Sequence, residues 1–195
     1  QVVWDKVWKR NDFILGSSYR YTFYDDDTPA TNSTSGNNPN VSKIGSVFLQ
    51  DSYTLNEKQK VLIGSRIDFT NQNGLVYTPR IGYKINFNRL QGIRLNAGTG
   101  FRVVNLFTED HAALTGARDV IIEEELKPEQ SYNANINYTG TFYTKKNNSI
   151  NLDVTAFYTY FINKIFPVYD SDPNKIIYKN LDGYAISEGI TANIS

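Results

Sequence analysis

Polar and apolar residues alternate along most of this chain. From Tyr132 to Tyr143, tyrosine, alanine, isoleucine and phenylalanine take nearly every second position, and asparagine and threonine take the positions between them. Successive side chains of a β-strand point to opposite faces, so this spacing predicts a strand with one apolar and one polar face. The same pattern, clear or weaker, predicts further strands at Val2–Lys9, Phe13–Tyr24, Ile44–Leu55, Val61–Thr70, Leu75–Asn88, Ile93–Arg102, Ile150–Ile162 and Tyr184–Ile194.

Most of these predicted strands are long. They hold about 10 to 14 residues, whereas strands of soluble proteins typically hold about 5 or 6. A tilted strand that crosses a membrane needs about 9 to 11 residues. The mean hydropathy is −0.44, and the short apolar runs exclude a membrane-spanning helix, which needs roughly 20 apolar residues in a row. Strand length therefore favours a membrane β-barrel.

The connections between the predicted strands alternate in length. Short polar turns are expected at residues 10–12, 56–58, 89–91 and 144–148, and longer connections at 25–42, 103–128 and 164–175. The connection at Asn73-Gly74 is a short hairpin turn, although its place in the alternation puts it with the longer connections. Short periplasmic turns and long extracellular loops are typical of outer-membrane barrels. The sequence therefore predicts an all-β fold: the wall of an antiparallel, up-and-down transmembrane β-barrel with about 8–9 long strands.

The two faces of such a wall have different surroundings. The apolar face would meet lipid, with tyrosine and phenylalanine near the strand ends as an interfacial girdle, and the polar face would line a wet lumen. Because every backbone group in hydrocarbon must be paired, only a closed barrel is stable there. The odd strand number, the first residue Gln1 and the lack of methionine lead us to expect a piece of a larger protein.

Composition narrows the functional classes. The 20 basic and 20 acidic residues balance, so no global field attracts nucleic acid, and no nucleic-acid partner is expected. The chain has no cysteine and a single histidine, His111, which removes disulfides, thiolate metal sites and multi-histidine zinc sites. No Gly-x-Ser-x-Gly elbow is present. We therefore expect no catalytic residues, no metal site and no cofactor.

Several short motifs follow one another along the chain. They are Tyr24-Asp-Asp-Asp-Thr-Pro-Ala30, Gln50-Asp-Ser-Tyr53, Gly64-Ser-Arg-Ile-Asp68, Tyr77-Thr-Pro-Arg-Ile-Gly-Tyr83, Gly98-Thr-Gly-Phe-Arg102, Asn105-Leu-Phe107, and Leu126-Lys-Pro-Glu129 before Tyr132. In this order they resemble the C-terminal half of the barrel of TonB-dependent outer-membrane receptors. The resemblance implies that residues 1–195 are a partial β-barrel domain of such a receptor, without its plug and TonB box.

The resemblance also implies a function for the whole receptor. It would be a non-enzymatic receptor and transporter in the outer membrane of a Gram-negative cell, where it takes up a scarce ligand with energy supplied through TonB. The ligand would be a ferric siderophore, a cobalamin-like cofactor or an oligosaccharide. The partners would be outer-membrane lipid, TonB and the plug domain of the full-length receptor. The long loops would select the ligand.

Charged residues in the long connections are candidate ligand contacts. Oxygen clusters suit hard cations, so one interpretation of the acidic runs is capture of Ca²⁺ or a ferric ligand, and the other is a solvated loop rim. The longest connection holds a histidine and an arginine that either contact substrate or are ordinary surface residues. The candidates are Asp25, Asp26, Asp27, His111 and Arg118, together with the run Glu123, Glu124 and Glu125.

Four arginines fall on the polar faces of three consecutive predicted strands: Arg66, Arg80, Arg94 and Arg102. If the strand register aligns them, they form an arginine ladder in the lumen, where charge is tolerated. Such a ladder would bind an anionic substrate or the plug. The alternative is salt bridging across the wall to Asp68, Asp51 or Asp153.

Two other classes of protein remain open. A soluble secreted β-sandwich that binds carbohydrate would use tyrosine and tryptophan as sugar-stacking platforms, but it should have shorter strands and long loops at both ends. A passive porin-like wall would lack the receptor-like motifs.

Overall fold

The computed structural model describes residues 1–25, 32–33, 36–37, 39–71, 74–102, 119–122, 124, 126–145, 148–169 and 172–195. Strands account for most of these residues. Among the described segments, none is a helix with the length and apolar character that a membrane crossing requires.

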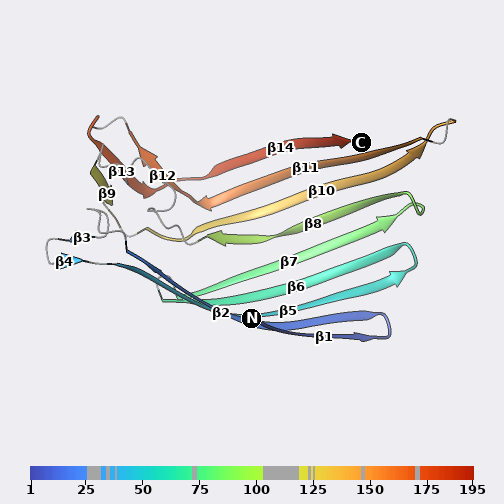
Figure 1. Cartoon of the computed structure of the whole chain (residues 1–195), viewed down its shortest axis with the longest axis horizontal. Helices are drawn as coiled ribbons and strands as arrows, with labels where there is room; N and C mark the ends of the chain where they lie inside the picture. Colours follow the sequence, from blue (N-terminus) through green and yellow to red (C-terminus); the bar gives the residue numbers. More distant parts are fainter. Residues whose placement is uncertain are drawn as a thin grey trace.

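Nine of the strands found in the described residues form one continuous sheet. Each is antiparallel to its neighbours, and the order in the sheet follows the order in the chain (Figure 1). The strands are β1 (Val2–Trp8), β2 (Asn11–Tyr24), β5 (Asn40–Asn56), β6 (Gln59–Thr70), β7 (Gly74–Asn86), β8 (Gln91–Arg102), β10 (Glu129–Tyr143), β11 (Ser149–Asn163) and β14 (Ala185–Ile194). The nine predicted strands and the up-and-down antiparallel topology are thus confirmed. β1 and β14 are the two edges of the sheet, so these strands form a wall and not a closed barrel.

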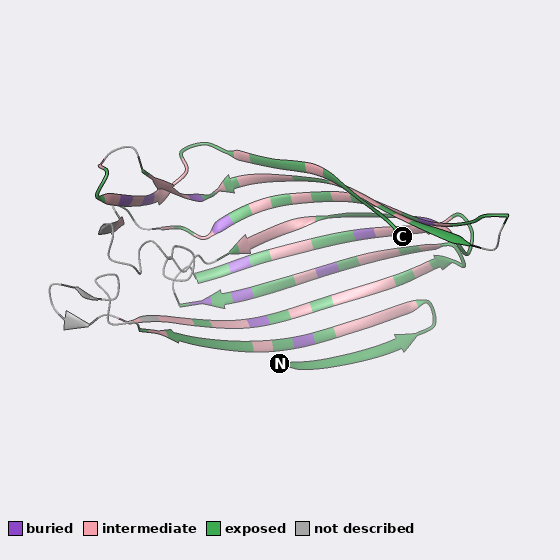
Figure 2. Ribbon diagram, turned by 45° about the horizontal axis from the view of Figure 1, so that its top comes forward, coloured by how far each residue is buried: buried purple, intermediate pink, exposed green. Residues whose placement is uncertain are grey.

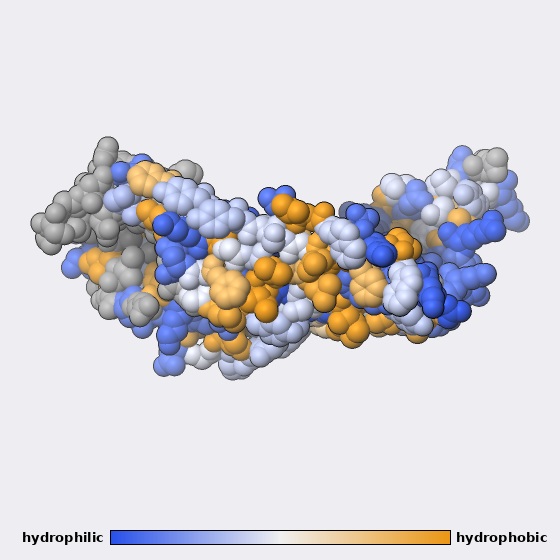
Figure 3. Space-filling view, turned by 90° about the horizontal axis from the view of Figure 1, so that it is seen from below, coloured by the Kyte–Doolittle hydropathy of each residue, from blue (hydrophilic) through white to orange (hydrophobic). Residues whose placement is uncertain are grey.

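The register keeps apolar residues on one face and most polar residues on the other. Leu95 pairs with Ile136, and Asn96 pairs with Asn135. Exposed large hydrophobic side chains continue along the apolar face, including Leu15, Leu49, Ile63, Ile81 and Leu95. Buried positions are scattered along the strands in Figure 2 and form no covered layer beneath the sheet. Figure 3 shows hydrophobic residues gathered over the middle of the molecule's length, and hydrophilic residues concentrated at the end with the short turns.

The short turns and the long connections lie at opposite ends of the sheet (Figure 1). Local side-chain caps close two of the short turns: the Asn56 Oδ1 accepts a hydrogen bond from the Lys58 N–H at 2.9 Å, and the Asn88 Oδ1 accepts one from the Leu90 N–H at 2.8 Å. Asparagine favours turns through this kind of bond to its own backbone. The sequence predicted short turns at one end of the sheet and long connections at the other, and this division is confirmed. We call these the turn end and the loop end.

The long connections contain more structure than the sequence predicted. Residues assigned to loops form β9 (Asp119–Ile122) and β12 (Ile165–Val168), and β13 (Lys175–Asn180) begins at the last residue of the expected connection 164–175. These strands make a small sheet in the order β12-β13-β9. β3 (Asn32–Ser33) and β4 (Gly36–Asn37) pair with each other, and β5 starts within the expected first loop. The pairing of β9 with β13 joins two connections far apart in the chain, so no local pattern indicates it.

The small sheet supplies the one cluster of buried apolar side chains in the described residues. Ile165, Ile176 and Tyr178 are buried together, and Leu126 packs against them. A β-sandwich would bury a core between two packed sheets along its strands. Here the nine long strands form a single sheet, which excludes the sandwich alternative.

Two neighbouring positions of β10 test the assignment of the faces. Ile136 lies on the apolar face and Asn135 on the polar face. In a membrane, Ile136→Arg should lower the free energy of unfolding by about 2–4 kcal/mol, because a lipid-facing arginine near the bilayer midplane is poorly solvated. Asn135→Arg should lower the free energy of unfolding by only about 1 kcal/mol, because it removes the hydrogen bond that Asn96 donates to Asn135. Guanidinium titration of the full-length protein in lipid vesicles measures both, and equal losses would contradict the assignment.

Candidate functional site

A polar hollow of about 560 Å³ lies at the loop end of the polar face. Its lining comes from four strands of the sheet and from the first residue of the chain. The polar and charged side chains around it include Ser18, Arg20, Ser46, Arg66, Asp68 and Arg102. These residues are far apart in the chain, and the antiparallel register brings them to one concave surface.

The centre of the hollow is a hydrogen-bonded cluster of Ser46, Arg66 and Asp68. Ser46 on β5 pairs directly with Asp68 on β6, and its hydroxyl donates to the Asp68 Oδ1 at 2.5 Å. Arg66 lies two positions before Asp68 and so shares its face. The Arg66 Nε donates to both carboxylate oxygens of Asp68, at 2.8 and 3.0 Å, and Nη2 donates to the Ser46 Oγ at 2.9 Å.

Burial of Asp68 makes the hydrogen bonds of this cluster necessary. The Asp68 side chain is fully buried, whereas that of Arg66 is 44% exposed. A buried carboxylate needs hydrogen-bond donors, and Arg66 and Ser46 supply them. The exposed part of the guanidinium still faces the hollow, where a negatively charged group could approach it.

A second charged pair joins the wall to the small sheet. The Arg102 Nε and Nη2 contact the Glu129 Oε2, at 2.9 Å and 2.8 Å. The other carboxylate oxygen of Glu129 accepts a hydrogen bond from the backbone N–H of Ile165 at 3.1 Å. One buried carboxylate therefore connects β8, β10 and β12.

Arg80 lies between two glycines on the polar face. It pairs with Gly64 on β6 and with Gly98 on β8, and its Nη2 donates a hydrogen bond to the Gln50 Oε1 on β5. A Cβ atom at Gly64 would lie 2.9 Å from the Arg80 Nε. Glycine at position 64 thus leaves room for the guanidinium to cross β6.

The register does not align the four arginines in one row. Arg66 pairs with Thr78 and Arg80 with Gly64, Arg94 pairs with Lys84, and Arg102 pairs with Glu129. All four share the polar face, but each lies in its own row, and Arg94 lines a separate hollow near the turn end. The condition for an arginine ladder is therefore not met.

Of the three expected acidic partners, only Asp68 forms a salt bridge with one of these arginines among the described residues. Asp51 lies on the apolar face, where it pairs with Phe13 and accepts a hydrogen bond from the Asn11 side chain at 2.7 Å. Asp153 accepts a hydrogen bond from Asn137 at 2.9 Å.

Most candidate loop residues lie outside the described residues, namely Asp26, Asp27, His111, Arg118, Glu123 and Glu125. Asp25 follows the end of β2 and is exposed. The Glu124 Oε1 accepts a hydrogen bond from the Asn180 N–H at 2.7 Å. Glu124 thus ties the longest connection to β13, which fits a structural role for this residue. Across the described part of the chain, no group of three or more acidic, histidine or cysteine side chains could hold a metal ion.

One loop carboxylate has a shifted pKa. The N–H of Asn174 donates to the Asp172 Oδ1 at 2.9 Å, and the Lys175 Nζ lies 3.3 Å from Oδ2. These contacts, the backbone hydrogen bond first, lower the pKa of Asp172 below its usual value. Asp172 therefore stays ionised in the connection between β12 and β13.

Sequence reasoning missed several residues of this region: Arg20, Ser46, Gln50 and Glu129. Arg20, Ser46 and Gln50 lie at polar positions of predicted strands, so the pattern places them on the polar face. Glu129 precedes the run that begins at Tyr132, and the structure extends β10 to include it. Their partners depend on the register between strands, which alternation alone does not give.

Comparison with known proteins is consistent with this geometry. Residues 3–195 match the family model described as "TonB dependent receptor-like, beta-barrel". The chain therefore belongs to this family, whose members are receptors and transporters, and it is located in the cell outer membrane.

Individual relatives support the fold. Over 120 residues the chain is 27% identical to an iron-regulated outer membrane virulence protein of Vibrio cholerae serotype O1, covering 60% of this chain and 18% of that protein. The siderophore receptor PirA of Pseudomonas aeruginosa aligns with a TM-score of 0.70 at 16% identity, over 94% of this chain and 33% of PirA. The ferric enterobactin receptor PfeA of the same organism, solved as a Q482A mutant in complex with enterobactin, aligns with a TM-score of 0.69 at 18% identity. This alignment covers 93% of this chain and 30% of PfeA. The chain thus spans about a fifth to a third of the length of these relatives.

The Ser46–Arg66–Asp68 cluster can be tested by removing its acceptor. Asp68→Ala should lower the free energy of unfolding by about 1–3 kcal/mol, because Ser46 and Arg66 lose hydrogen bonds to a charged partner. Asp153→Ala, on the same face, removes the acceptor of a single bond from Asn137 and should cost at most about 1 kcal/mol. Guanidinium titration in lipid vesicles compares them, and an Asp68 loss no larger than that of Asp153 would contradict the role of the cluster.

Proposed function

We propose that this chain is part of the wall of an outer-membrane receptor that takes up a ferric siderophore with energy supplied through TonB. Support comes from the family match and from relatives that are described as siderophore receptors or as iron-regulated. The receptor is not an enzyme in this proposal, and iron is its cargo.

The observation that carries the proposal is the polar hollow at the loop end. It opens on the face opposite to the apolar one, and Arg20, Arg66 and Arg102 line it. Asp68 and Glu129 offset the charges of Arg66 and Arg102, so Arg20 supplies the net positive charge. Siderophores that hold iron through several anionic oxygens carry negative charge, and arginine recognises planar oxygen groups through paired hydrogen bonds. A hollow of this kind suits an anionic ligand that arrives from the loop side.

The remaining candidate residues have roles in this proposal. Asp25, Asp26, Asp27, His111 and Arg118 contact the ligand from the extracellular connections, which choose among ligands. Arg66, Arg80, Arg94 and Arg102 face the lumen. A plug domain and TonB belong to the full-length receptor, and lipid surrounds the apolar face.

A binding experiment with two exposed arginines tests the proposal. Arg20 lines the hollow at the loop end, and Arg94 lies near the turn end of the same face. In the full-length receptor, Arg20→Ala should raise the apparent Kd for the ferric siderophore about tenfold, equal to 1.4 kcal/mol. Arg94→Ala should leave the Kd unchanged. Equilibrium binding of the radioactive ferric siderophore to cells that lack other siderophore receptors gives both Kd values.

The same cells supply the control for energy coupling. Deletion of TonB should abolish uptake and leave surface binding intact. Uptake that persists without TonB would contradict the proposal and favour a passive pore. Failure of the receptor to bind any ferric siderophore would also contradict it.

A further inference from the structure

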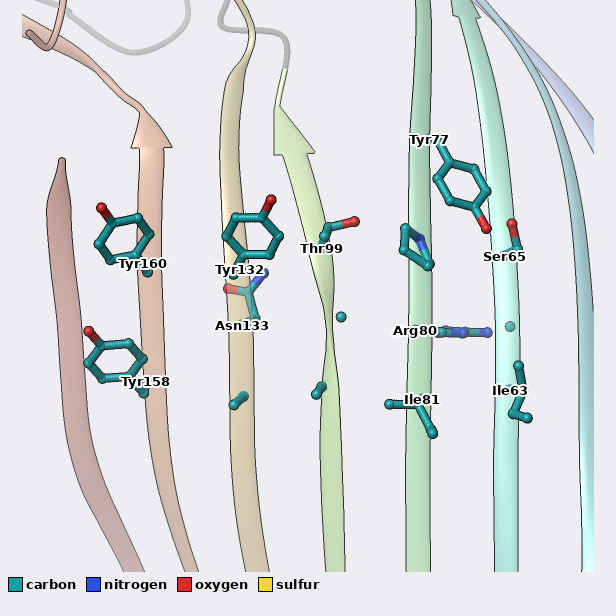
Figure 4. A pocket seen from close by; sticks show the side chains of 15 residues that line it. Ile63, Ser65, Tyr77, Arg80, Ile81, Thr99, Tyr132, Asn133, Tyr158 and Tyr160 are labelled. Carbon is teal, nitrogen blue, oxygen red and sulfur yellow. The ribbon is translucent and has the colours of Figure 1, made fainter. Parts of the chain in front are cut away.

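The apolar face of the wall carries an elongated hollow. Two adjoining depressions of about 580 Å³ and about 600 Å³ share Ile81, Ala97, Ala134 and Tyr158 in their linings. We call the two depressions together the apolar groove. It runs over β6, β7, β8, β10 and β11, and Figure 4 shows the first of the two depressions.

The strand register explains the groove. Ile81 pairs with Ala97, Ala97 pairs with Ala134, and Ala134 pairs with Tyr158. This row therefore reads large, small, small, large across four neighbouring strands. Adjacent strands lie about 4.8 Å apart. In this row the two central strands carry only methyl groups, which leaves a depression between the side chains of Ile81 and Tyr158.

Tyrosine side chains line both ends of the groove, and Tyr83 belongs to the row of Leu95 at the far end. Tyr132 and Tyr160 stand at its loop end, one row above the alanines. Figure 4 shows the hydroxyl groups of Tyr132, Tyr158 and Tyr160 pointing toward the loop end. Tyrosines at a membrane surface place their rings in hydrocarbon and their hydroxyls at the level of the headgroups.

The other end of the groove lies in the middle of the wall. There Leu95 and Ile136 form the next row below the alanines. From Tyr132 to Ile136 the groove covers four residues of β10, or about 14 Å at about 3.4 Å per residue. This length is close to half of the hydrocarbon core, which is about 30 Å thick.

We propose that the apolar groove binds one acyl chain of a lipid in the outer leaflet, with the lipid headgroup at the loop end of the groove. The groove is lined by hydrocarbon apart from backbone atoms and a few hydroxyl groups. Its length along β10 matches about one leaflet, and the hydroxyl groups of Tyr132, Tyr158 and Tyr160 point toward the loop side. Arg80 and Asn133 neighbour groove residues in sequence, but their side chains belong to the polar face. The inference rests on the position of the chain in the barrel wall and not on the identity of the transported ligand.

Photocrosslinking of the full-length receptor tests this site. The probe is a phosphatidylethanolamine with a diazirine on one acyl chain, mixed into vesicles that contain the receptor. Crosslinks should concentrate on the peptides with Ala97 and Ala134, relative to the apolar face of β2 and β5. Ala134→Phe fills the groove and should lower this crosslinking about threefold, a modest factor because packing is the main gain between apolar groups in lipid.

A matched variant controls for a general effect of the added ring. Ala192→Phe makes the same change on the apolar face of β14, opposite Val154 and outside the groove lining, and it should leave the crosslinking unchanged. If Ala134→Phe does not fold, Ala97→Ile provides a smaller filling. Iron uptake should stay normal in each folded variant, so a failed uptake proposal and a failed lipid site give different results.

Three outcomes would overturn the inference. Crosslinks could spread evenly over the apolar face, or Ala134→Phe could leave them unchanged. Native mass spectrometry could instead find a second copy of the receptor, released by Ala134→Phe, which would make the groove a protein interface.

Discussion

The structure depends on the need to pair every backbone polar group within a hydrocarbon environment. A strand satisfies this need only through its neighbours, and a row of strands satisfies it only if their pairing is continuous. The nine long strands are paired in this way from β1 to β14. Their two-residue alternation follows, because one face must tolerate lipid while the other can hold asparagine, threonine and arginine.

The register converts this general pattern into particular sites. On the polar face, it sets Ser46 opposite Asp68 and leaves Gly64 beside Arg80. On the apolar face, it sets Ala97 beside Ala134. A shift by one residue would move every side chain of a strand to the other face, so the charged hollow and the apolar groove depend on the same pairing.

The sequence predicted the wall well and the connections less well. Strands such as Tyr132–Tyr143 show strict alternation over a long run, and they appear where the pattern placed them. β9 and β13 are short and pair across a large separation in the chain, so neither length nor periodicity indicates them. The arginines of the polar face could be assigned to a face, but not to their partners. The bond between Glu129 and Ile165 requires the fold of the connections, which local residue patterns do not contain.

The central claim is that one face of this wall meets lipid and the other meets water. Because this chain has no cysteine, single cysteines can be placed along β10 from position 132 to 141 in the full-length receptor and spin-labelled in vesicles. Labels at even positions should be accessible to oxygen dissolved in lipid, and labels at odd positions should be accessible to a water-soluble relaxation agent. Uniform access of the water-soluble agent to both sets of positions would contradict the claim.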